Sequence, residues 1–363
     1  MATTQSQNHQ FVFSDVMSYN VHGNFVSEKI SKIRWRPDGF NESNSFVTGS
    51  ADNDVNNVRL WEFCEIEEDI FPIAVASLPY CGDVTEIKFL NPNYFVSSSS
   101  SGSVHLQTIV TGPADDVGLK QENKWTDIHY FFNGDRSSCT GLALYESDIV
   151  TVGEDGRINL LTAQMENVVR TIENADSCSI QSVIFMKHNE ILTSNLRAQM
   201  KIWDLRVPDD KPSNSFMLNG DQVIPTCLAF HPNQRHLVIA GDELGALSVW
   251  DLRHDTFPVN VFNAHEGSIS EIQFNRDDPN KLFSCSSAGE VWHWASKGRK
   301  QFSSGFDEDA SVWLVPGSAK SNLEVFTLMS TIDKPINSLD MCKGRVICGC
   351  DNEAIYLING PDL

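Results

Sequence analysis

The chain has 363 residues, of which 41% are hydrophobic, so it is long and apolar enough to bury a sizeable core. It carries 48 acidic and 27 basic side chains, and the resulting net charge of −21 repels phosphate backbones and argues against direct nucleic-acid binding. The 8 Trp and 21 Phe need a packed interior and exclude a disordered acidic tail.

The N-terminus and the cysteines indicate the cellular compartment. Residues 1–7 have neither the basic nor the apolar segment of a signal peptide, and no run in the chain approaches the roughly 18 apolar residues of a membrane span. The nine cysteines are odd in number, and most lie in apolar runs, as reduced and buried thiols do. We therefore expect no secretion and no membrane insertion, and a location in the cytosol or nucleus.

The first third of the chain sets the pattern of the predicted elements. Residues 1–23 are polar and are predicted to form a flexible tail, ahead of a single domain over residues 24–363. Residues 24–29 are the first β-type run. Two further short runs at residues 32–36 and 45–49 precede a phrase that ends in Trp61.

That phrase recurs along the chain as a turn residue, three alternating residues and then Trp or a substitute. The seven copies are Val58-Arg59-Leu60-Trp61, Val104-His105-Leu106-Gln107, Ile158-Asn159-Leu160-Leu161, Met200-Lys201-Ile202-Trp203, Leu247-Ser248-Val249-Trp250, Val291-Trp292-His293-Trp294 and Ile355-Tyr356-Leu357-Ile358. The spacings between their last residues are 46, 54, 42, 47, 44 and 64. A period of roughly 40–45 residues with four strands each predicts an all-β propeller with seven blades.

Two long spacings mark insertions, at residues 111–137 and 297–320. Both segments are polar and are predicted to be loops between blades. The last copy ends a few residues before the end of the sequence and therefore lacks a fourth strand. Residues 24–29 stand in the right place to supply it, so we predict a ring closed by an N-terminal strand, which also covers an exposed sheet edge.

The pairs Trp203-Asp204 and Trp250-Asp251 are the most specific short signals, and with them the repeats resemble the WD-repeat family. In that family Trp packs between blades and Asp opens the turn to the outer strand. The stabilising network of that family, in which a His precedes the inner strand and a Ser or Thr, a turn Asp and the Trp complete the set, is patchy here. The markers that we expect to support the blades are Trp61, Asp155, Trp203, Asp204, Trp250, Asp251, His265 and Trp294. Ala288 stands where the sixth copy should have its Asp, and Leu161 where the third should have its Trp.

Templates for catalysis, metals and cofactors fail. The chain has no His-Glu-x-x-His and no Gly-x-Ser-x-Gly, and its Gly153-Glu154-Asp155-Gly156 turn is too acidic to hold a phosphate. Cys348 and Cys350 lie two apart on a predicted strand with no His within 50 residues, which favours burial over zinc. We predict no catalytic residues, no metal, no cofactor and no small-molecule substrate.

Several longer stretches resemble one group within the WD-repeat family. They lie within residues 25–37, 149–160, 170–177 and 353–356, and the longest unbroken one is Ile149-Val150-Thr151-Val152-Gly153-Glu154-Asp155-Gly156-Arg157-Ile158-Asn159-Leu160. They are similar to the small WD-repeat nucleoporins of the Y-shaped outer-ring complex of the nuclear pore. The resemblance implies a structural subunit on the short arm of that complex, partnered by its other subunits at the nuclear envelope rim. It also implies support of pore assembly, mRNA export and protein import, and a place at kinetochores in mitosis.

A second function stays open on the sequence. Trp203-Asp204-Leu205-Arg206 and Trp250-Asp251-Leu252-Arg253 resemble the Trp-Asp-x-Arg box that docks substrate-recognition propellers to cullin-type ubiquitin ligases. Both arginines could instead pair with surface acids. The acidic runs at residues 65–69 and 307–309 are expected to be solvated loop segments.

Overall fold

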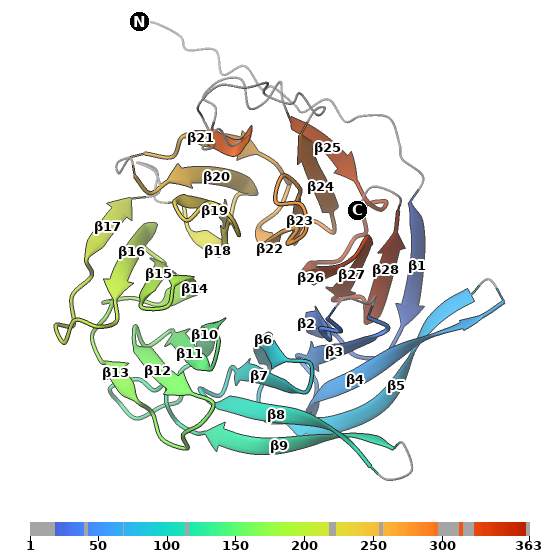
Figure 1. The fold of residues 1–363 in the computed structure, drawn as a ribbon, viewed down its shortest axis with the longest axis horizontal. Coiled ribbons are helices and arrows are strands. Elements are labelled where there is room, and N and C mark those ends of the chain that lie inside the picture. Colours follow the sequence, from blue (N-terminus) through green and yellow to red (C-terminus); the bar gives the residue numbers. More distant parts are fainter. Residues whose placement is uncertain are drawn as a thin grey trace, which may run out of the picture.

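The computed structural model describes residues 19–39, 43–67, 69–112, 116–217, 223–253, 257–296, 312–314 and 323–360. Within these residues the chain forms seven four-stranded antiparallel sheets, arranged as blades around a central channel (Figure 1). The predicted all-β, seven-bladed propeller is confirmed. Most of the predicted tail and the acidic run at residues 307–309 lie outside the described residues.

Each blade is a meander whose strands follow the chain from the channel outward. Blade 1 contains β2 (Ile30–Trp35), β3 (Ser45–Ser50), β4 (Asn56–Ile66) and β5 (Asp69–Tyr80). Blade 2 contains β6 (Val84–Asn91), β7 (Tyr94–Ser99), β8 (Val104–Thr111) and β9 (Val117–Trp125), and blade 3 contains β10 (Cys139–Tyr145), β11 (Asp148–Gly153), β12 (Ile158–Thr162) and β13 (Arg170–Ile172). Blade 4 contains β14 (Ile180–Lys187), β15 (Glu190–Asn195), β16 (Gln199–Asp204) and β17 (Asn214–Met217).

The remaining blades repeat this order. Blade 5 contains β18 (Pro225–Phe230), β19 (Leu237–Asp242), β20 (Ala246–Asp251) and β21 (Asn260–Asn263). Blade 6 contains β22 (Ile269–Phe274), β23 (Leu282–Ser286), β24 (Val291–Ser296) and β25 (Leu323–Thr327), and blade 7 contains β26 (Ile336–Cys342), β27 (Arg345–Cys350), β28 (Ala354–Asn359) and the N-terminal β1 (Asn20–Phe25). All seven recurring phrases form the third strand of a blade, as their period predicts.

The core lies between blades, because neighbouring blades cover both faces of every sheet. In β3, β11, β15 and β27 the first residue is partly buried and the next five are fully buried. A fully buried Val, Ile or Leu contributes about 1.5–3 kcal/mol relative to an exposed one. Trp61 stacks on Phe46 at a ring-centroid distance of 6.3 Å, and Trp203, Trp250 and Trp294 are almost wholly buried.

The N-terminal strand closes the ring, as predicted. β1 pairs antiparallel with β28, from Asn20 opposite Asn359 to Phe25 opposite Ala354 (Figure 1). Its limits differ from the predicted residues 24–29, and the boundary of the propeller lies at or before Asn20 and not at residue 24. Ser27 has a left-handed φ of 62° and ends the extended run, while the edge of β28 selects the residues upstream.

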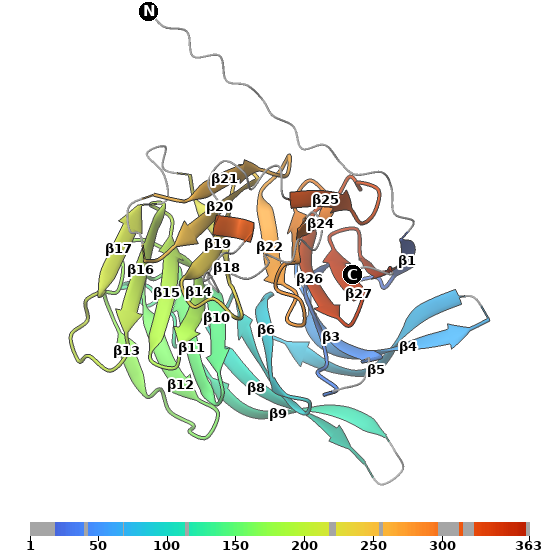
Figure 2. The same cartoon turned by 45° about the horizontal axis from the view of Figure 1, so that its top comes forward.

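The first insertion is only partly the loop that its polar composition predicted: residues 126–137 lack a named strand, but a strand precedes them. Residues 117–125 form β9, whose register with β8 is maintained from Thr111 opposite Val117 to Val104 opposite Trp125, with one shift between Leu106 and Gln107. β9 is polar because it is an outer strand with an exposed edge. Together with β4 and β5, of 11 and 12 residues, β8 and β9 form two long hairpins that extend beyond the disc (Figure 2).

The second insertion is described only at the short 3-10 helix η1 (Val312–Leu314), which is the one helix among the described residues and is far too short to cross a membrane. Trp313 is fully buried against Phe274 of blade 6, with ring centroids 5.9 Å apart. Asn260 of blade 5 donates a hydrogen bond to the Trp313 carbonyl at 2.9 Å. This part of the predicted loop therefore belongs to the core of blades 5 and 6.

Candidate functional site

A buried network in blade 3 joins the loop before β10 to the turn between β11 and β12. His129 Nδ1 lies 3.0 Å from Asp155 Oδ1, and His129 Nε2 lies 3.0 Å from Thr151 Oγ1. Asp155 also accepts a hydrogen bond from the Tyr130 backbone N–H at 2.9 Å and pairs with Arg157 at 3.3 Å. Asp155 thus joins a side chain, a backbone group and a guanidinium that come from different segments.

The charges in this network reinforce one another. Burial alone would raise the pKa of Asp155, but the hydrogen bond and charge of His129 and two backbone N–H groups lower it. Burial alone would lower the pKa of His129, whereas its neighbours Cys139 and Asp155 raise it to about 9. Gly156, with φ of 74°, completes the turn, and a Cβ there would clash with the Asp176 carbonyl oxygen.

Blade 6 has a complete network that the sequence only partly predicted. His265 Nε2 lies 2.7 Å from Ser284 Oγ, and the indole Nε1 of Trp294 donates to the same oxygen at 2.9 Å. His265 Nδ1 lies 3.0 Å from Glu290 Oε2, which also accepts a hydrogen bond from Ser286 at 3.1 Å. In blade 6 a glutamate therefore binds the histidine, where the sequence predicts an aspartate.

Glu290 was missed because it stands at a different position. Ala288 occupies the place that Asp155 has in blade 3, and Glu290 lies two residues later, where blade 3 has Arg157. Ala288 and Glu290 lie on either side of the turn glycine Gly289, and the glutamate side chain reaches His265 Nδ1 from the later position. A search for any carboxylate within two residues of the turn glycine would have found it.

The other predicted markers lie on third strands without such a network. Trp61 donates through Nε1 to Thr48 Oγ1 at 2.8 Å, and Trp203 and Trp250 donate to Thr193 Oγ1 at 3.0 Å and Ser248 Oγ at 3.1 Å. Asp204 and Asp251 each follow one of these tryptophans. Each accepts hydrogen bonds from the backbone and guanidinium of the arginine two residues on, Arg206 and Arg253.

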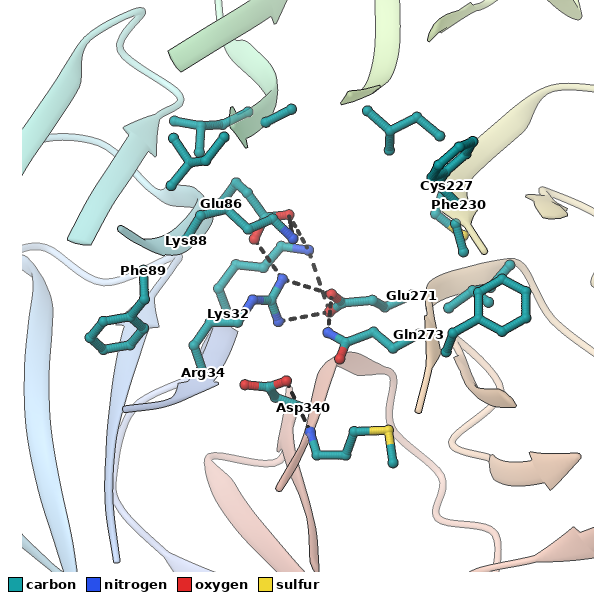
Figure 3. Close-up of a pocket in the computed structure, with 18 of the residues that line it drawn as sticks. Lys32, Arg34, Glu86, Lys88, Phe89, Cys227, Phe230, Glu271, Gln273 and Asp340 are labelled. Carbon is teal, nitrogen blue, oxygen red and sulfur yellow. Dashed lines mark hydrogen bonds and ion pairs between the residues drawn. The ribbon is translucent and has the colours of Figure 1, made fainter. Parts of the chain in front are cut away.

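The central channel carries an ionic cluster that sequence reasoning did not predict. Arg34 of blade 1 donates to Glu86 of blade 2 at 2.5 Å and to Glu271 of blade 6 at 2.6 Å (Figure 3). It also donates to Ser338 of blade 7 at 2.8 Å. Gln273 donates to Glu271 at 3.0 Å. One buried guanidinium thus bridges four blades around the point where the ring closes.

This cluster is electrostatically satisfied. Burial alone would raise the pKa of Glu271, but Arg34, Lys32 and Lys88 lower it well below its usual value, so the carboxylate stays ionised. The surrounding channel, with a volume of about 680 Å³, is lined by first strands of the blades. The available sequence signal was a charged pair two residues apart in a first strand, such as Lys32 and Arg34.

Four of the nine cysteines, Cys139, Cys285, Cys348 and Cys350, are buried, whereas Cys81 is exposed and the other four are partly buried. Cys348 and Cys350 are fully buried in one cluster with Ile336 and Ile358, and burial raises the pKa of both thiols. Within the described residues, no three His, Cys, Asp or Glu side chains lie close enough to hold a metal ion.

Comparison with known proteins places this architecture in a family. Human nucleoporin Nup43 is 36% identical over 374 aligned residues, which cover 93% of this chain and 98% of the human one. The chain belongs to the nucleoporin Nup43 family. A Nup43-family nuclear pore complex protein of Dictyostelium discoideum is 24% identical over 77% of this chain and 83% of its own, and one of Arabidopsis thaliana is 24% identical over 71% and 79%.

The family profile "WD domain, G-beta repeat" matches residues 212–251. That span begins just before β17 of blade 4 and ends with β20 of blade 5, so the sequence repeat combines an outer strand with the three inner strands of the next blade. This offset is the same one that lets β1 complete blade 7 of this Nup43-family chain. It follows that the chain is a WD-repeat nucleoporin with a propeller fold.

Proposed function

We propose that the chain is a scaffold subunit of the Y-shaped outer-ring complex of the nuclear pore, where it binds other subunits of that complex. In this role it supports pore assembly, mRNA export and protein import, acts without catalysis or cofactor, and accompanies the complex to kinetochores in mitosis. The observation that carries the proposal is the similarity to human nucleoporin Nup43 along nearly the whole of both chains.

The chemistry of the molecule supports a binding role. Its strongest charged cluster, around Arg34 and Glu271, is buried and internally paired, which is typical of structure and not of catalysis. The surface, in contrast, offers loops on two rims and two long hairpins, the parts of a propeller that present binding residues.

Imaging a fluorescently tagged chain in living cells tests the location. We expect a punctate signal at the nuclear rim in interphase and paired foci on mitotic chromosomes. A diffuse cytosolic signal would contradict the pore assignment, and a rim signal without mitotic foci would contradict only the kinetochore role.

Affinity purification separates this function from that of a ubiquitin ligase receptor. Arg206 and Arg253, which suggest the ligase box, are each engaged by the aspartate of their own phrase. We expect outer-ring nucleoporins to be recovered in stoichiometric amounts. Recovery of a cullin adaptor without nucleoporins would reject the scaffold proposal in favour of the ligase.

A further inference from the structure

The loop that precedes β10 presents three consecutive aromatic side chains on one rim of the propeller. In a meander that runs outward, the turns between second and third strands and the loops into the next blade lie at the same rim. The loop after β9 and the turn after β11 therefore share a rim, whereas the loop after β20, which carries Phe257, lies at the opposite rim.

The aromatic turn, residues 130–136, exposes an apolar patch to solvent, which is unfavourable unless a partner covers it. Phe132 is 90% exposed, and Tyr130 and Phe131 are each 38% exposed. Nowhere else among the described residues do three consecutive large hydrophobic side chains exceed a third exposure. Scattered exposed apolar residues such as Leu244 are ordinary, but a contiguous aromatic group marks an interaction site.

The turn is held in one conformation by its own hydrogen bonds. The Phe131 N–H donates to the Asp135 carbonyl at 2.8 Å, and the Gly134 N–H donates to the Phe131 carbonyl at 2.9 Å. The Asp135 N–H donates to Asn133 Oδ1 at 3.0 Å, and Tyr130 forms a β-bridge with Arg136. A preformed turn loses little conformational entropy on binding, which favours affinity.

The buried network of blade 3 supports the base of this turn. Asp155 accepts a hydrogen bond from the Tyr130 N–H, and the Arg157 guanidinium lies 3.7 Å from the centre of the Tyr130 ring while donating to its carbonyl. Arg157 is in turn fixed by Glu173 at 2.5 Å. The blade core thus positions the exposed aromatic residues.

The rim of the turn is acidic. Asp127, Asp135, Glu154 and Glu173 are exposed around it, whereas the exposed base there is Arg136, which pairs with Asp127 at 3.2 Å. The Glu154 N–H donates to the Ser138 carbonyl, which places that turn directly beside the loop. An aromatic centre with a charged rim is the usual anatomy of a protein interface.

We propose that the aromatic turn is the anchor by which this chain docks onto another subunit of the pore scaffold, and that the partner offers an apolar pocket bordered by Lys and Arg. The charge complementarity of the acidic rim selects a basic border over an acidic one. This inference rests on the proposed function, since it names the surface that the scaffold role would use.

The test measures binding of purified chain to an outer-ring complex of the same organism that has been reconstituted without this subunit. Phe132→Asp is compared with wild type and with the matched control Phe257→Asp, which alters a 72% exposed phenylalanine on the opposite rim. We expect Phe132→Asp to raise the Kd at least about tenfold and Phe257→Asp to change it less than about twofold. Thermal melting of each variant checks that the propeller is intact.

The outcomes separate the inference from the proposed function. If Phe132→Asp binds like wild type, or if both variants lose affinity equally, the aromatic turn is not the anchor although the scaffold role stands. If wild-type chain does not bind at all, the scaffold role itself fails.

A charge reversal tests the nature of the partner. Glu154→Lys at the rim of the turn should weaken binding by about threefold or more, and Glu65→Lys at the tip of the β4–β5 hairpin should not. Equal or tighter binding by Glu154→Lys would overturn the basic border.

Discussion

Blades 3 and 6 contain the same kind of buried histidine network, built from different residues. Both tie a histidine in the incoming loop to a hydroxyl on the second strand and to a carboxylate near the turn. Blade 3 uses Asp155 but has Leu161 in place of the tryptophan, whereas blade 6 keeps Trp294 but moves its carboxylate to Glu290. The network thus requires that a histidine, a hydroxyl and a carboxylate meet in space. The sequence position that supplies the carboxylate can differ between blades.

The two networks also differ in what else they hold. Asp155 additionally binds the backbone and neighbouring guanidinium at the base of the aromatic turn. Ser284 in blade 6 instead bridges His265 to Trp294 and so links the network to the core between blades. The network of blade 3 is therefore bonded to the exposed aromatic turn, and that of blade 6 is bonded to a tryptophan buried between blades.

Asp155→Ala is expected to cause the largest fall in the free energy of unfolding. The change would leave a buried histidine and arginine without their shared carboxylate, and loss of one partner of a buried ion pair costs about 3–5 kcal/mol. Urea denaturation would measure the fall in the free energy of unfolding. The surface pair offers a control: Asp204→Ala, which removes the partner of the exposed Arg206, should lower the free energy of unfolding far less, because solvent screens that pair. Equal losses would mean that the blade 3 network is no stronger than a surface pair.

Ser284→Ala should have the next largest effect. It removes the oxygen shared by His265 and Trp294, and each lost buried hydrogen bond costs about 1–1.5 kcal/mol, so the total should be about 2–3 kcal/mol. Thr151→Val in blade 3 removes only the hydroxyl bonded to His129 and keeps the shape of the side chain, so it should cost about 1–1.5 kcal/mol. If the two variants have the same urea midpoint, the link to the tryptophan contributes nothing measurable.

Glu290→Ala tests the displaced carboxylate. We expect a loss of about 1–2 kcal/mol, because Glu290 is less deeply buried than Asp155 and holds fewer groups. Adding Ala288→Asp should recover at least half of the loss by restoring the arrangement of blade 3. The double variant should therefore melt above the single variant, and a lower melting temperature would show that blade 6 cannot use that position.

Last, the stability of the fold is expected to depend on pH. His129, with its pKa raised to about 9, contributes stability that is present below its unfolded pKa of about 6.5 and lost as pH rises towards 9. Burial lowers the pKa of His265, so its effect is opposite and weakens the fold as pH falls below about 6.5.

Imidazole proton titration by NMR should place the two midpoints on opposite sides of 6.5. His129→Gln should flatten the alkaline limb of the stability profile, and His265→Gln should flatten the acidic limb. Coincident midpoints would contradict the electrostatic contrast between the two blades.

Much of the fold could be predicted from the sequence because the repeat is local. Each phrase ending in Trp or its substitute is a short alternating run, and its spacing fixes the number of blades without knowledge of distant contacts. The limits of β1 could not be predicted in the same way, because the edge of β28, more than 300 residues away, selects its register. β9 escaped prediction because an outer strand needs no apolar face.

The sequence by itself determined the seven blades, the third strands on which the tryptophan markers lie and the acidic net charge, since these follow from period and composition. Tertiary structure alone decided which carboxylate serves blade 6, how Arg34 meets Glu271 across 237 residues of chain, and that Phe131 and Phe132 stand exposed on a fixed turn. The physical reason is that these features arise where the closed ring brings separate blades together, and the distances involved do not exist until it closes.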